Sequence, residues 1–228
     1  MELFSDATIL KAWHENAQPW TQAVRQALIP SRVLVTDAAI VQTVLAHCPP
    51  QAQARVIDLG CGEGWLVRAL AAQGLDVLGL DAVLALIEQA RAADGADYGV
   101  VSYEDIVQAR FKTRAQMVVC NFSLLGGEIV DALCQALPAW LAPQGRLVIQ
   151  TLHPLIACGD LPYEDGWRPG SWADCEGAFH EPAPWYFRTL ASWVQLLTQA
   201  GFMLLEMREP LHPQTKRPAS VIFVAQPR

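Results

Sequence analysis

Short apolar runs alternate with amphipathic segments through the middle of the chain. Apolar runs bounded by glycine or polar residues are typical of buried strands, whereas apolar positions three and four residues apart are typical of helices. The predicted strands are residues 55–59, 76–80, 98–102, 115–120 and 146–151, and the predicted helices between them are residues 65–73, 83–93 and 129–141. This alternation predicts an α/β fold with a doubly wound, mostly parallel sheet covered by helices on both faces.

The two ends of the chain follow other patterns. Residues 8–28 have helical spacing, but Pro19 lacks a backbone N–H, so we expect two shorter helices there. Thr36 is typical of a helix cap, and the helix after it should run to about His47. Near the C-terminus we expect a helix and then two strands, which short proline-containing connections indicate are antiparallel: residues 190–200, 202–207 and 220–225.

One long segment, residues 152–186, has little periodicity and is rich in proline, glycine, tryptophan and acidic residues. An irregular stretch of this length in a compact domain is usually functional. Aromatic residues gather in and just after it: Tyr163, Trp167, Trp172, Phe179, Trp185, Tyr186, Phe187 and Trp193. We therefore expect an aromatic lid, and the alternative is a small satellite core under a long loop.

The sharpest local signal follows the first predicted strand and reads Asp58-Leu59-Gly60-Cys61-Gly62-Glu63-Gly64. Glycines let the backbone turn tightly and approach a ligand closely, and the next helix presents unpaired N–H groups at its N-terminus. Asp81 ends the following strand, where a carboxylate can accept hydrogen bonds from both hydroxyls of a ribose. These features predict a nucleoside cofactor site, and the alternative is a turn that only packs helix against strand.

Two kinds of cofactor fit this geometry. A dinucleotide fingerprint reads G-x-G-x-x-G, whereas this loop reads G-x-G-x-G with Asp58 two residues before the first glycine. In S-adenosylmethionine, the ammonium group suits an acid at the end of a strand and the carboxylate suits the loop N–H groups. The spacing therefore favours S-adenosylmethionine, and a nucleotide-dependent oxidoreductase stays as the weaker alternative.

The glycine loop and Asp81 resemble motifs I and II of the class I S-adenosylmethionine-dependent methyltransferases, over roughly residues 54–151. The resemblance implies a Rossmann-like, seven-stranded sheet of order 3-2-1-4-5-7-6 with strand 7 antiparallel. It also implies S-adenosylmethionine as cofactor and S-adenosylhomocysteine as product. Ser102-Tyr103 replaces the usual Asp-Ala of the family, which puts the adenine contact in question. The positions assigned to cofactor binding are Asp58, Gly60, Cys61, Gly62, Asp81, Ala82, Ser102, Tyr103, Asn121 and Phe122.

A finer resemblance, to a bacterial subgroup that acts on small molecules, rests on residues 13–17, 20, 31–32 and 184–190. It implies that an N-terminal helix covers the cofactor and that Arg32 pairs with the methionine carboxylate, which suits a guanidinium. An ordinary surface arginine is the alternative. We accordingly expect one domain over residues 1–228, comprising an N-terminal helical cover (1–50), a cofactor-binding core (54–151), an acceptor lid (152–188) and a closing helix and strand pair (189–228).

The acceptor side needs a group that aligns a nucleophile and removes its proton, because methyl transfer is an in-line displacement. His153 directly follows the fifth predicted strand, at the carboxyl edge where doubly wound sheets bind ligands. It is our preferred catalytic residue, and His180 and Glu181 in the lid come next, ahead of Glu164 and Asp165. We expect the aromatic lid to form the acceptor pocket.

Charge and composition narrow the partners. Lys and Arg number 16 against 23 Asp and Glu, a net charge of −7, which argues against a nucleic-acid partner. Asn121-Phe122-Ser123 also lacks the Asn/Asp-Pro-Pro-aromatic motif common in methylases of amino groups in DNA and protein. No apolar run is long enough for a transmembrane helix, and the N-terminus lacks the pattern of a signal peptide. We expect a cytoplasmic monomer or homodimer without a membrane partner.

Six cysteines without a C-x-x-C pair predict reduced, buried thiols rather than a disulfide scaffold. His153, Cys158, Cys175 and His180 are possible zinc ligands, but their spacing matches no recognised zinc pattern, so we expect no metal. The predicted function is methyl transfer from S-adenosylmethionine to a small-molecule acceptor with an oxygen, nitrogen or carbon nucleophile. A catalytically inactive S-adenosylmethionine-binding protein is the main alternative.

Overall fold

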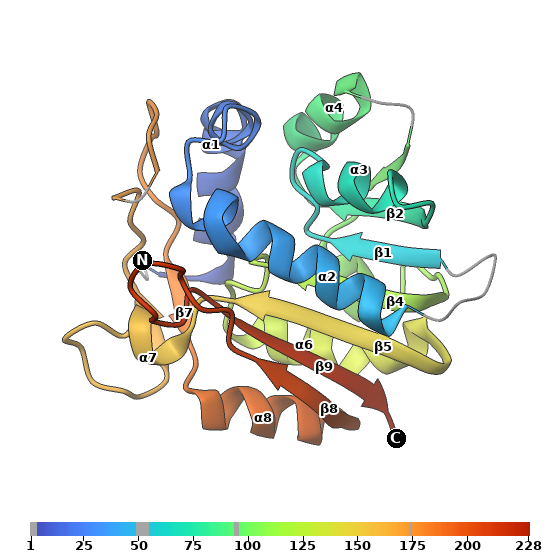
Figure 1. Cartoon of the computed structure of the whole chain (residues 1–228). Coiled ribbons are helices and arrows are strands. Elements are labelled where there is room, and N and C mark those ends of the chain that lie inside the picture. Colours follow the sequence, from blue (N-terminus) through green and yellow to red (C-terminus); the bar gives the residue numbers. More distant parts are fainter. Residues whose placement is uncertain (1–3, 49–54, 94–95, 174) are drawn as a thin grey trace.

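A seven-stranded sheet forms the centre of the molecule, with strands in the order β3-β2-β1-β4-β5-β9-β8 (Figure 1). The computed structural model describes residues 4–48, 55–93, 96–173 and 175–228. The strands of this sheet are β1 (Arg55–Leu59), β2 (Asp76–Asp81), β3 (Asp97–Val100), β4 (Ala115–Asn121), β5 (Leu141–Thr151), β8 (Phe202–Arg208) and β9 (Val221–Pro227).

The strand pairing confirms the predicted topology. Strands β3, β2, β1, β4 and β5 are parallel, whereas β9 is antiparallel to both β5 and β8. Two short strands, β6 (Gly166–Arg168) and β7 (Trp185–Phe187), form a separate antiparallel pair. When β6 and β7 are left out of the count, the order is 3-2-1-4-5-7-6 with strand 7 antiparallel.

Helices cover both faces of the sheet. The helices α2 (Asp37–His47), α3 (Trp65–Ala71) and α4 (Leu84–Ala93) pack on one face. The opposite face is covered by α5 (Tyr103–Val107), α6 (Glu128–Ala136) and α8 (Leu190–Gln199). The central strand β4 is therefore buried on both sides, and Met117 through Cys120 are 0% exposed. None of the helices in the described part of the chain is long and apolar enough to cross a bilayer.

The N-terminal helix is continuous, so the prediction of two shorter helices was wrong. Helix α1 (Asp6–Arg25) runs through Pro19. An internal proline removes one backbone hydrogen bond, but most helical stability in proteins comes from packing of a buried face. The buried side of α1 includes Ala12, Ala17 and Ala23, and these contacts keep the helix intact on both sides of the proline.

Strand β5 begins at Leu141, five residues before the predicted start, so the prediction of a helix up to that point was wrong. The 3₁₀ turn η2 (Leu137–Trp140) ends the helical segment earlier. Leu141 then pairs with Ala115 of β4, and the register shifts between Ala115 and Met117. This irregularity accommodates residues 142–145, whose proline and glycine resemble a helix stop in the sequence alone.

Two helix starts also differ from prediction. A π-helical turn, η1 (Arg32–Thr36), leads directly into α2, so the Thr36 side chain makes no capping hydrogen bond. Ser102 caps the unpredicted α5, because its hydroxyl accepts from the Asp105 N–H and its own N–H donates to the Asp105 carboxylate. The third strand consequently ends at Val100 rather than at residue 102.

The predicted acceptor lid, residues 152–188, contains the short helix α7 (Pro154–Ala157) and the strand pair β6–β7. In Figure 1 the thin orange part of this segment rises beside α1. The lid therefore lies against the N-terminal helix, although the two are far apart in the sequence. The four-part division of the chain remains a prediction.

Candidate functional site

The glycine loop follows β1 and is held against the end of β2. Gly60, Gly62 and Gly64 all have positive φ angles, of 79°, 57° and 84°. The backbone N–H groups of Gly60 and Cys61 both donate to the Leu80 carbonyl, at 2.7 and 3.0 Å. A Cβ on Gly60 would lie 2.3 Å from the Cβ of Ser123. Glycine is therefore required at position 60 by both backbone conformation and space.

Asp81, at the end of β2, binds the backbone on both sides of the site. Its Oδ2 accepts from the Gly62 N–H at 2.9 Å, and its Oδ1 accepts from the Val83 N–H at 2.8 Å. Burial raises the pKa of this carboxyl, and the backbone amides of Val83, Gly62 and the adjacent Ala82 oppose that shift. The carboxylate is thus fixed in position and still has lone pairs for a ligand.

Asp58, the penultimate residue of β1, is 1% exposed. Burial raises its pKa to about 8, with a further increase from Asp81 and an opposing effect from the Arg32 guanidinium. Its Oδ1 is buried and has no hydrogen-bond partner among the described residues. A buried acceptor without a partner costs about 1–3 kcal/mol. The position is therefore suited to a ligand that brings a positively charged donor.

Arg32 and Thr36 come from the π-helical turn η1 and lie near the same place. The Arg32 guanidinium is 4.6 Å from the centre of the Trp65 ring, and its Nε donates to Asp37 Oδ1 at 3.0 Å. The Thr36 hydroxyl is buried and has no hydrogen-bond partner within the described part of the chain. Short π-helical turns occur frequently at functional sites. Thr36 is a polar group of this site that sequence reasoning did not identify.

Glu63 lies within the glycine loop and anchors it to two helices, a role that the sequence did not indicate. This carboxylate is 0% exposed and accepts from Arg25 Nε at 2.8 Å and from an Arg68 nitrogen at 2.7 Å. Arg25 belongs to α1 and Arg68 to α3, so one buried charge joins the loop to two helices. The loop sequence alone does not predict this role, because it depends on Arg25 and Arg68, which belong to two helices outside the loop.

Ser102 and Tyr103, predicted to contact adenine, lie at the start of α5. Tyr103 points toward the glycine loop: its hydroxyl donates to the Ser123 carbonyl at 3.0 Å and would be 3.2 Å from a Cβ on Gly60. Ser102 uses its hydroxyl within the capping box with Asp105. The structure thus brings Tyr103 close to the loop and leaves Ser102 beside it in a structural role.

Asn121 is the last residue of β4 and Phe122 follows it. The predicted cofactor site and the predicted acceptor site meet at these two residues. The Asn121 side chain accepts from Gln150 Nε2 at 2.9 Å, and that nitrogen also donates to the Thr36 carbonyl at 3.1 Å. Phe122 has a φ of 53°, which is uncommon for a residue with a bulky side chain. Such strained residues cluster at active sites and ligand clamps.

An aromatic pocket lies next to Phe122, between the sheet edge and the lid. Its volume is about 20 Å³, so it has room for little more than one water molecule. Arg188 is the one charged residue among those that line it, and its guanidinium lies 4.8 Å from the centre of the Tyr186 ring. The pocket is lined by Phe122, Leu124, Leu125, Thr151, Leu152, Pro154, Trp185, Tyr186, Phe187, Arg188 and Trp193. Side chains of the lid and of α8 thus close this site over the ends of β4 and β5.

His153 stands between two pocket-lining residues, Leu152 and Pro154, and is 2% exposed. Its Nε2 lies 2.7 Å from Oε1 of Glu209, a residue that follows β8. Its Nδ1 is buried with no hydrogen-bond partner in the described structure. A carboxylate only accepts hydrogen bonds, so this pairing places the Nε2 proton toward Glu209 and leaves the lone pair on Nδ1.

His180 and Glu181 are exposed in the lid, away from His153 in the sequence and in their contacts. Their recorded hydrogen bonds are made by the backbone: the His180 N–H donates to Asn16 Oδ1, and the Glu181 carbonyl accepts from Asn16 Nδ2. Of the weaker candidates, Asp165 accepts from the Thr189 N–H. Among the described residues, no group of three or more His, Cys, Asp or Glu is arranged to hold a metal ion.

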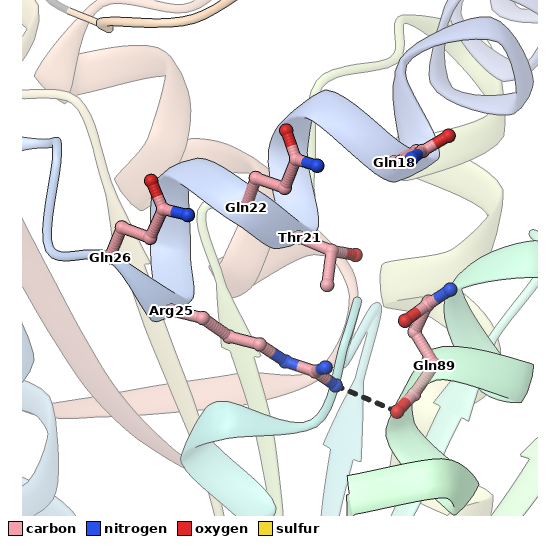
Figure 2. Close-up of a pocket in the computed structure, with 6 residues that line it drawn as sticks. All are labelled: Gln18, Thr21, Gln22, Arg25, Gln26 and Gln89. Carbon is pink, nitrogen blue, oxygen red and sulfur yellow. Dashed lines mark hydrogen bonds between the residues drawn. The ribbon is translucent and has the colours of Figure 1, made fainter.

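A second pocket, of about 190 Å³, lies between α1 and α4 (Figure 2). Figure 2 shows Arg25 reaching from α1 toward α4, where it donates to the Gln89 carbonyl at 2.7 Å. The lining is polar and consists of Gln18, Thr21, Gln22, Arg25, Gln26 and Gln89. No residue predicted for the cofactor or acceptor lines this pocket, and its clearest feature is the Arg25 link that fastens α1 to the cofactor side.

Comparison with known proteins returns one recurring class of enzyme. A family model described as a methyltransferase domain matches residues 36–207, a range that begins after α1. The ubiquinone biosynthesis O-methyltransferase of Xylella fastidiosa (strain M23) is 38% identical over 112 residues, 46% of this chain and 44% of that protein. The protein of the same description from Xanthomonas axonopodis pv. citri (strain 306) is 31% identical over 157 residues, 67% of this chain and 61% of that protein. The chain thus spans less than half of the first relative and less than two thirds of the second.

Solved structures share the fold. An S-adenosylmethionine dependent methyltransferase from Mesorhizobium loti superposes with a TM-score of 0.60 at 22% identity, covering 81% of this chain and 95% of that one. A magnesium protoporphyrin IX methyltransferase from Synechocystis PCC 6803, solved with bound S-adenosylmethionine, gives a TM-score of 0.56 at 15% identity, covering 92% and 83%. At these identities the structural likeness shows the fold alone.

Proposed function

The chain belongs to the class I S-adenosylmethionine-dependent methyltransferases, and on that premise we propose that it methylates a small acceptor held between the walls of the aromatic pocket. These walls must move apart to admit the acceptor, because the space between them is only about 20 Å³ in this structure. The favoured nucleophile is a hydroxyl oxygen. Two observations support this choice: the buried His153, which lies between two pocket-lining residues in the sequence, has an unpartnered Nδ1, and several matched curated relatives are described as ubiquinone biosynthesis O-methyltransferases. Another matched relative is described as a phosphoethanolamine N-methyltransferase. Nitrogen and carbon nucleophiles are the alternatives.

The observation that carries the proposal is the unpartnered Oδ1 of Asp58 beside the glycine loop. S-adenosylmethionine has an ammonium group in its methionine part, which would supply the missing donor and pair with the carboxylate once Asp58 has released its proton. When bound, the cofactor supplies an electrophilic methyl group on its sulfonium sulfur. The residues present therefore fit this cofactor.

The remaining cofactor contacts follow from the same placement. Asp81 would accept hydrogen bonds from the ribose hydroxyls, as its position at the end of β2 suggests. Arg32 and the Thr36 hydroxyl would bind the methionine carboxylate, because both come from η1 near Asp58. Gly60, Cys61 and Gly62 would let the backbone approach the cofactor closely, and Tyr103 would lie on its adenine side. Each of these roles is a proposal.

On the acceptor side, His153 would act as the general base. Its Nδ1 would take the proton of the acceptor hydroxyl, so that the oxygen becomes nucleophilic toward the methyl group that a bound cofactor would supply. Glu209 holds the ring in the tautomer that this step needs and stabilises the imidazolium that forms. The aromatic walls exclude water and orient a flat acceptor.

Binding and turnover measurements test the proposal. Isothermal titration should show binding of S-adenosylhomocysteine and none of NAD, and binding of NAD alone would overturn the assignment in favour of an oxidoreductase. Labelled S-adenosylmethionine should then transfer its methyl group to at least one member of a panel of phenols, catechols and hydroxyquinones. Binding without transfer across amines and carbon acids as well would support the inactive binder instead. An acceptor of this size also agrees with the net charge of −7, which disfavours nucleic acid.

A further inference from the structure

Asn16 is a fully buried polar residue in the middle of α1, and its side chain reaches the lid. Asn16 Oδ1 accepts from the His180 N–H at 2.8 Å, and Nδ2 donates to the Glu181 carbonyl at 3.2 Å. Nδ2 also donates to the Ala12 carbonyl of its own helix at 2.8 Å. The side-chain amide therefore makes two hydrogen bonds to the backbone of the lid, although Asn16 and His180 are 164 residues apart in the sequence.

Aromatic rings extend the same junction. Trp13 of α1 makes an edge contact with Trp172 of the lid, with ring centres 5.8 Å apart. Trp172 stacks on Phe179 at 4.3 Å and donates from Nε1 to the His180 carbonyl at 2.7 Å. The lid residues that meet Asn16 are thus held in place by the ring that meets Trp13.

The C-terminal part of α1 reaches the glycine loop, from the same helix face that carries Trp13 and Asn16. Trp20 packs edge-on against Trp13, with ring centres 5.1 Å apart, and its Nε1 lies 3.6 Å from the position of a Cβ on Gly62. Arg25, one turn further along, is bound to Glu63 of the loop. Figure 1 shows α1 between the orange lid segment on one side and the β1–β2 region on the other. One helix therefore contacts both the proposed cofactor site and the lid.

We propose that Asn16 is a positioning residue that couples the two half-sites: a cofactor at the glycine loop adds to the Arg25 links that hold α1, and Asn16 transmits this added order to the acceptor lid. The inference rests on the proposed function, because it needs S-adenosylmethionine or its product in the glycine-loop site. A ligand at that loop would lie close to α1, since Trp20 Nε1 is 3.6 Å from the position of a Cβ on Gly62. Movement of α1 moves Asn16, and the hydrogen bonds to residues 180 and 181 are then lost. The enzyme consequently binds cofactor first and acceptor second.

Amide hydrogen exchange measured by mass spectrometry tests this coupling without an identified acceptor. The probe is S-adenosylhomocysteine, added to the full chain, and the readout is exchange in peptides spanning residues 175–187. In the natural protein the ligand should slow exchange there by about fivefold or more, the low end of typical coupling between sites. In Asn16→Ala the ligand should still bind, and the ratio of exchange rates with and without it should fall to about one.

Gln18→Ala is the matched control, because Gln18 is an exposed amide on the same helix, two residues away. It should keep the ligand-dependent slowing. If Asn16→Ala does not fold, Trp172→Ala removes the junction from the lid side, where no core packing is lost, and should give the same loss of slowing. Slowing that persists in a folded Asn16→Ala, or in Trp172→Ala where Asn16→Ala does not fold, would overturn the coupling. Slowing that is absent from the natural protein although the ligand binds would overturn it as well. Absence of ligand binding in the natural protein would instead overturn the proposed function.

Discussion

The proposed cofactor half and the proposed acceptor half of the site differ in the kinds of side chain that form them and in the contacts that hold those side chains. The cofactor half takes Asp58, Gly60, Gly62 and Asp81 from two consecutive strand ends, so 24 residues of sequence contain its main features. The proposed acceptor half takes Phe122 and Leu152 from directly after β4 and β5, and Trp185 and Trp193 from the lid and α8. The first is polar and held by backbone hydrogen bonds, whereas the second is aromatic and held by packing.

The difference reflects what each half has to recognise. A cofactor with fixed charges needs carboxylates and N–H groups at defined distances, and a local loop supplies them with little freedom. An apolar acceptor needs a shaped surface, which many combinations of large side chains can supply. Substitutions in one half should therefore affect binding of S-adenosylhomocysteine, and substitutions in the other should affect turnover alone.

The sharpest test of this separation is His153→Gln, in the acceptor half. Loss of a general base lowers kcat by about 10²–10⁴-fold, while the dissociation constant of S-adenosylhomocysteine should not change, because His153 contacts Glu209 rather than the glycine loop. The measurement combines single-turnover methyl transfer with isothermal titration.

Glu209→Gln is the companion variant and should lower kcat with the same ligand affinity, by up to about 10⁴-fold where the ring takes the wrong tautomer. Added imidazole should partly restore His153→Gly. A fall in cofactor affinity that equals the fall in kcat would show that His153 supports the fold rather than the reaction.

In the cofactor half, Gly60→Ala should weaken binding of S-adenosylhomocysteine by about 100-fold, because the new methyl group meets the Cβ of Ser123 at 2.3 Å and the loop must shift. The matched control is Gly74→Ala, which has a φ of 84° but nothing within 4 Å of the added Cβ. Gly74→Ala should lower the thermal midpoint slightly and leave ligand affinity unchanged. Equal losses of affinity in both variants would mean that backbone strain alone, not contact with the ligand loop, explains the effect.

Asp81→Ala should weaken the same ligand by about 30-fold, equivalent to about 2 kcal/mol for lost hydrogen bonds to a charged group. Asp76→Ala, at the exposed start of the same strand, is the control and should have no effect on titration. An unchanged affinity in Asp81→Ala would remove this residue from the cofactor site.

The buried Asp58 predicts that the affinity for the cofactor depends on pH, whereas binding in the acceptor half does not depend on this residue. Its pKa is raised from 3.8 to about 8, chiefly by burial, so below pH 8 a cationic ligand must displace a proton to form the ion pair. Affinity should rise up to tenfold per pH unit between pH 6 and 8 and then level off. In the ligand-free protein the sign is opposite: the raised pKa destabilises the fold progressively as pH rises from about 4 to 8.

Titrations in two buffers of different ionisation enthalpy measure the released proton directly. Asp58→Asn should bind weakly and without this pH dependence. A natural protein whose affinity is flat from pH 6 to 8 would show that Asp58 is already ionised before the ligand arrives.

The sequence predicted those features that depend on neighbouring residues. The strand–glycine–helix unit around Gly60 was correct because it follows from local periodicity and one loop, whereas the sheet order was correct because the family resemblance implied it. The capping box of Ser102 and Asp105 was also readable from the sequence and was overlooked. The sequence could not predict that β5 begins at Leu141, because Pro143 and Gly145 are typical of the end of a helix. The earlier start depends on the pairing of Leu141 with Ala115 in β4.

Other features depend on contacts that no local pattern records. In the sequence, Asn16 is one polar residue of a helix among several, and its role depends on its contact with the lid segment. Likewise, the role of Glu63 depends on its ion pairs with Arg25 and Arg68. The residues predicted as bases in the lid, His180 and Glu181, instead make their recorded contacts through the backbone. Their catalytic role remains a prediction.

The buried carboxylate of Glu63 also constrains how this protein can change over evolutionary time. Losing one arginine leaves the buried carboxylate with a single partner, and losing both leaves it uncompensated, at a cost of about 3–5 kcal/mol. Losing the acid alone leaves two guanidiniums facing each other. The three positions should therefore be inherited as a set. Natural sequences that replace the acid should also replace both arginines, and a lineage with only one of the three changes would be rare.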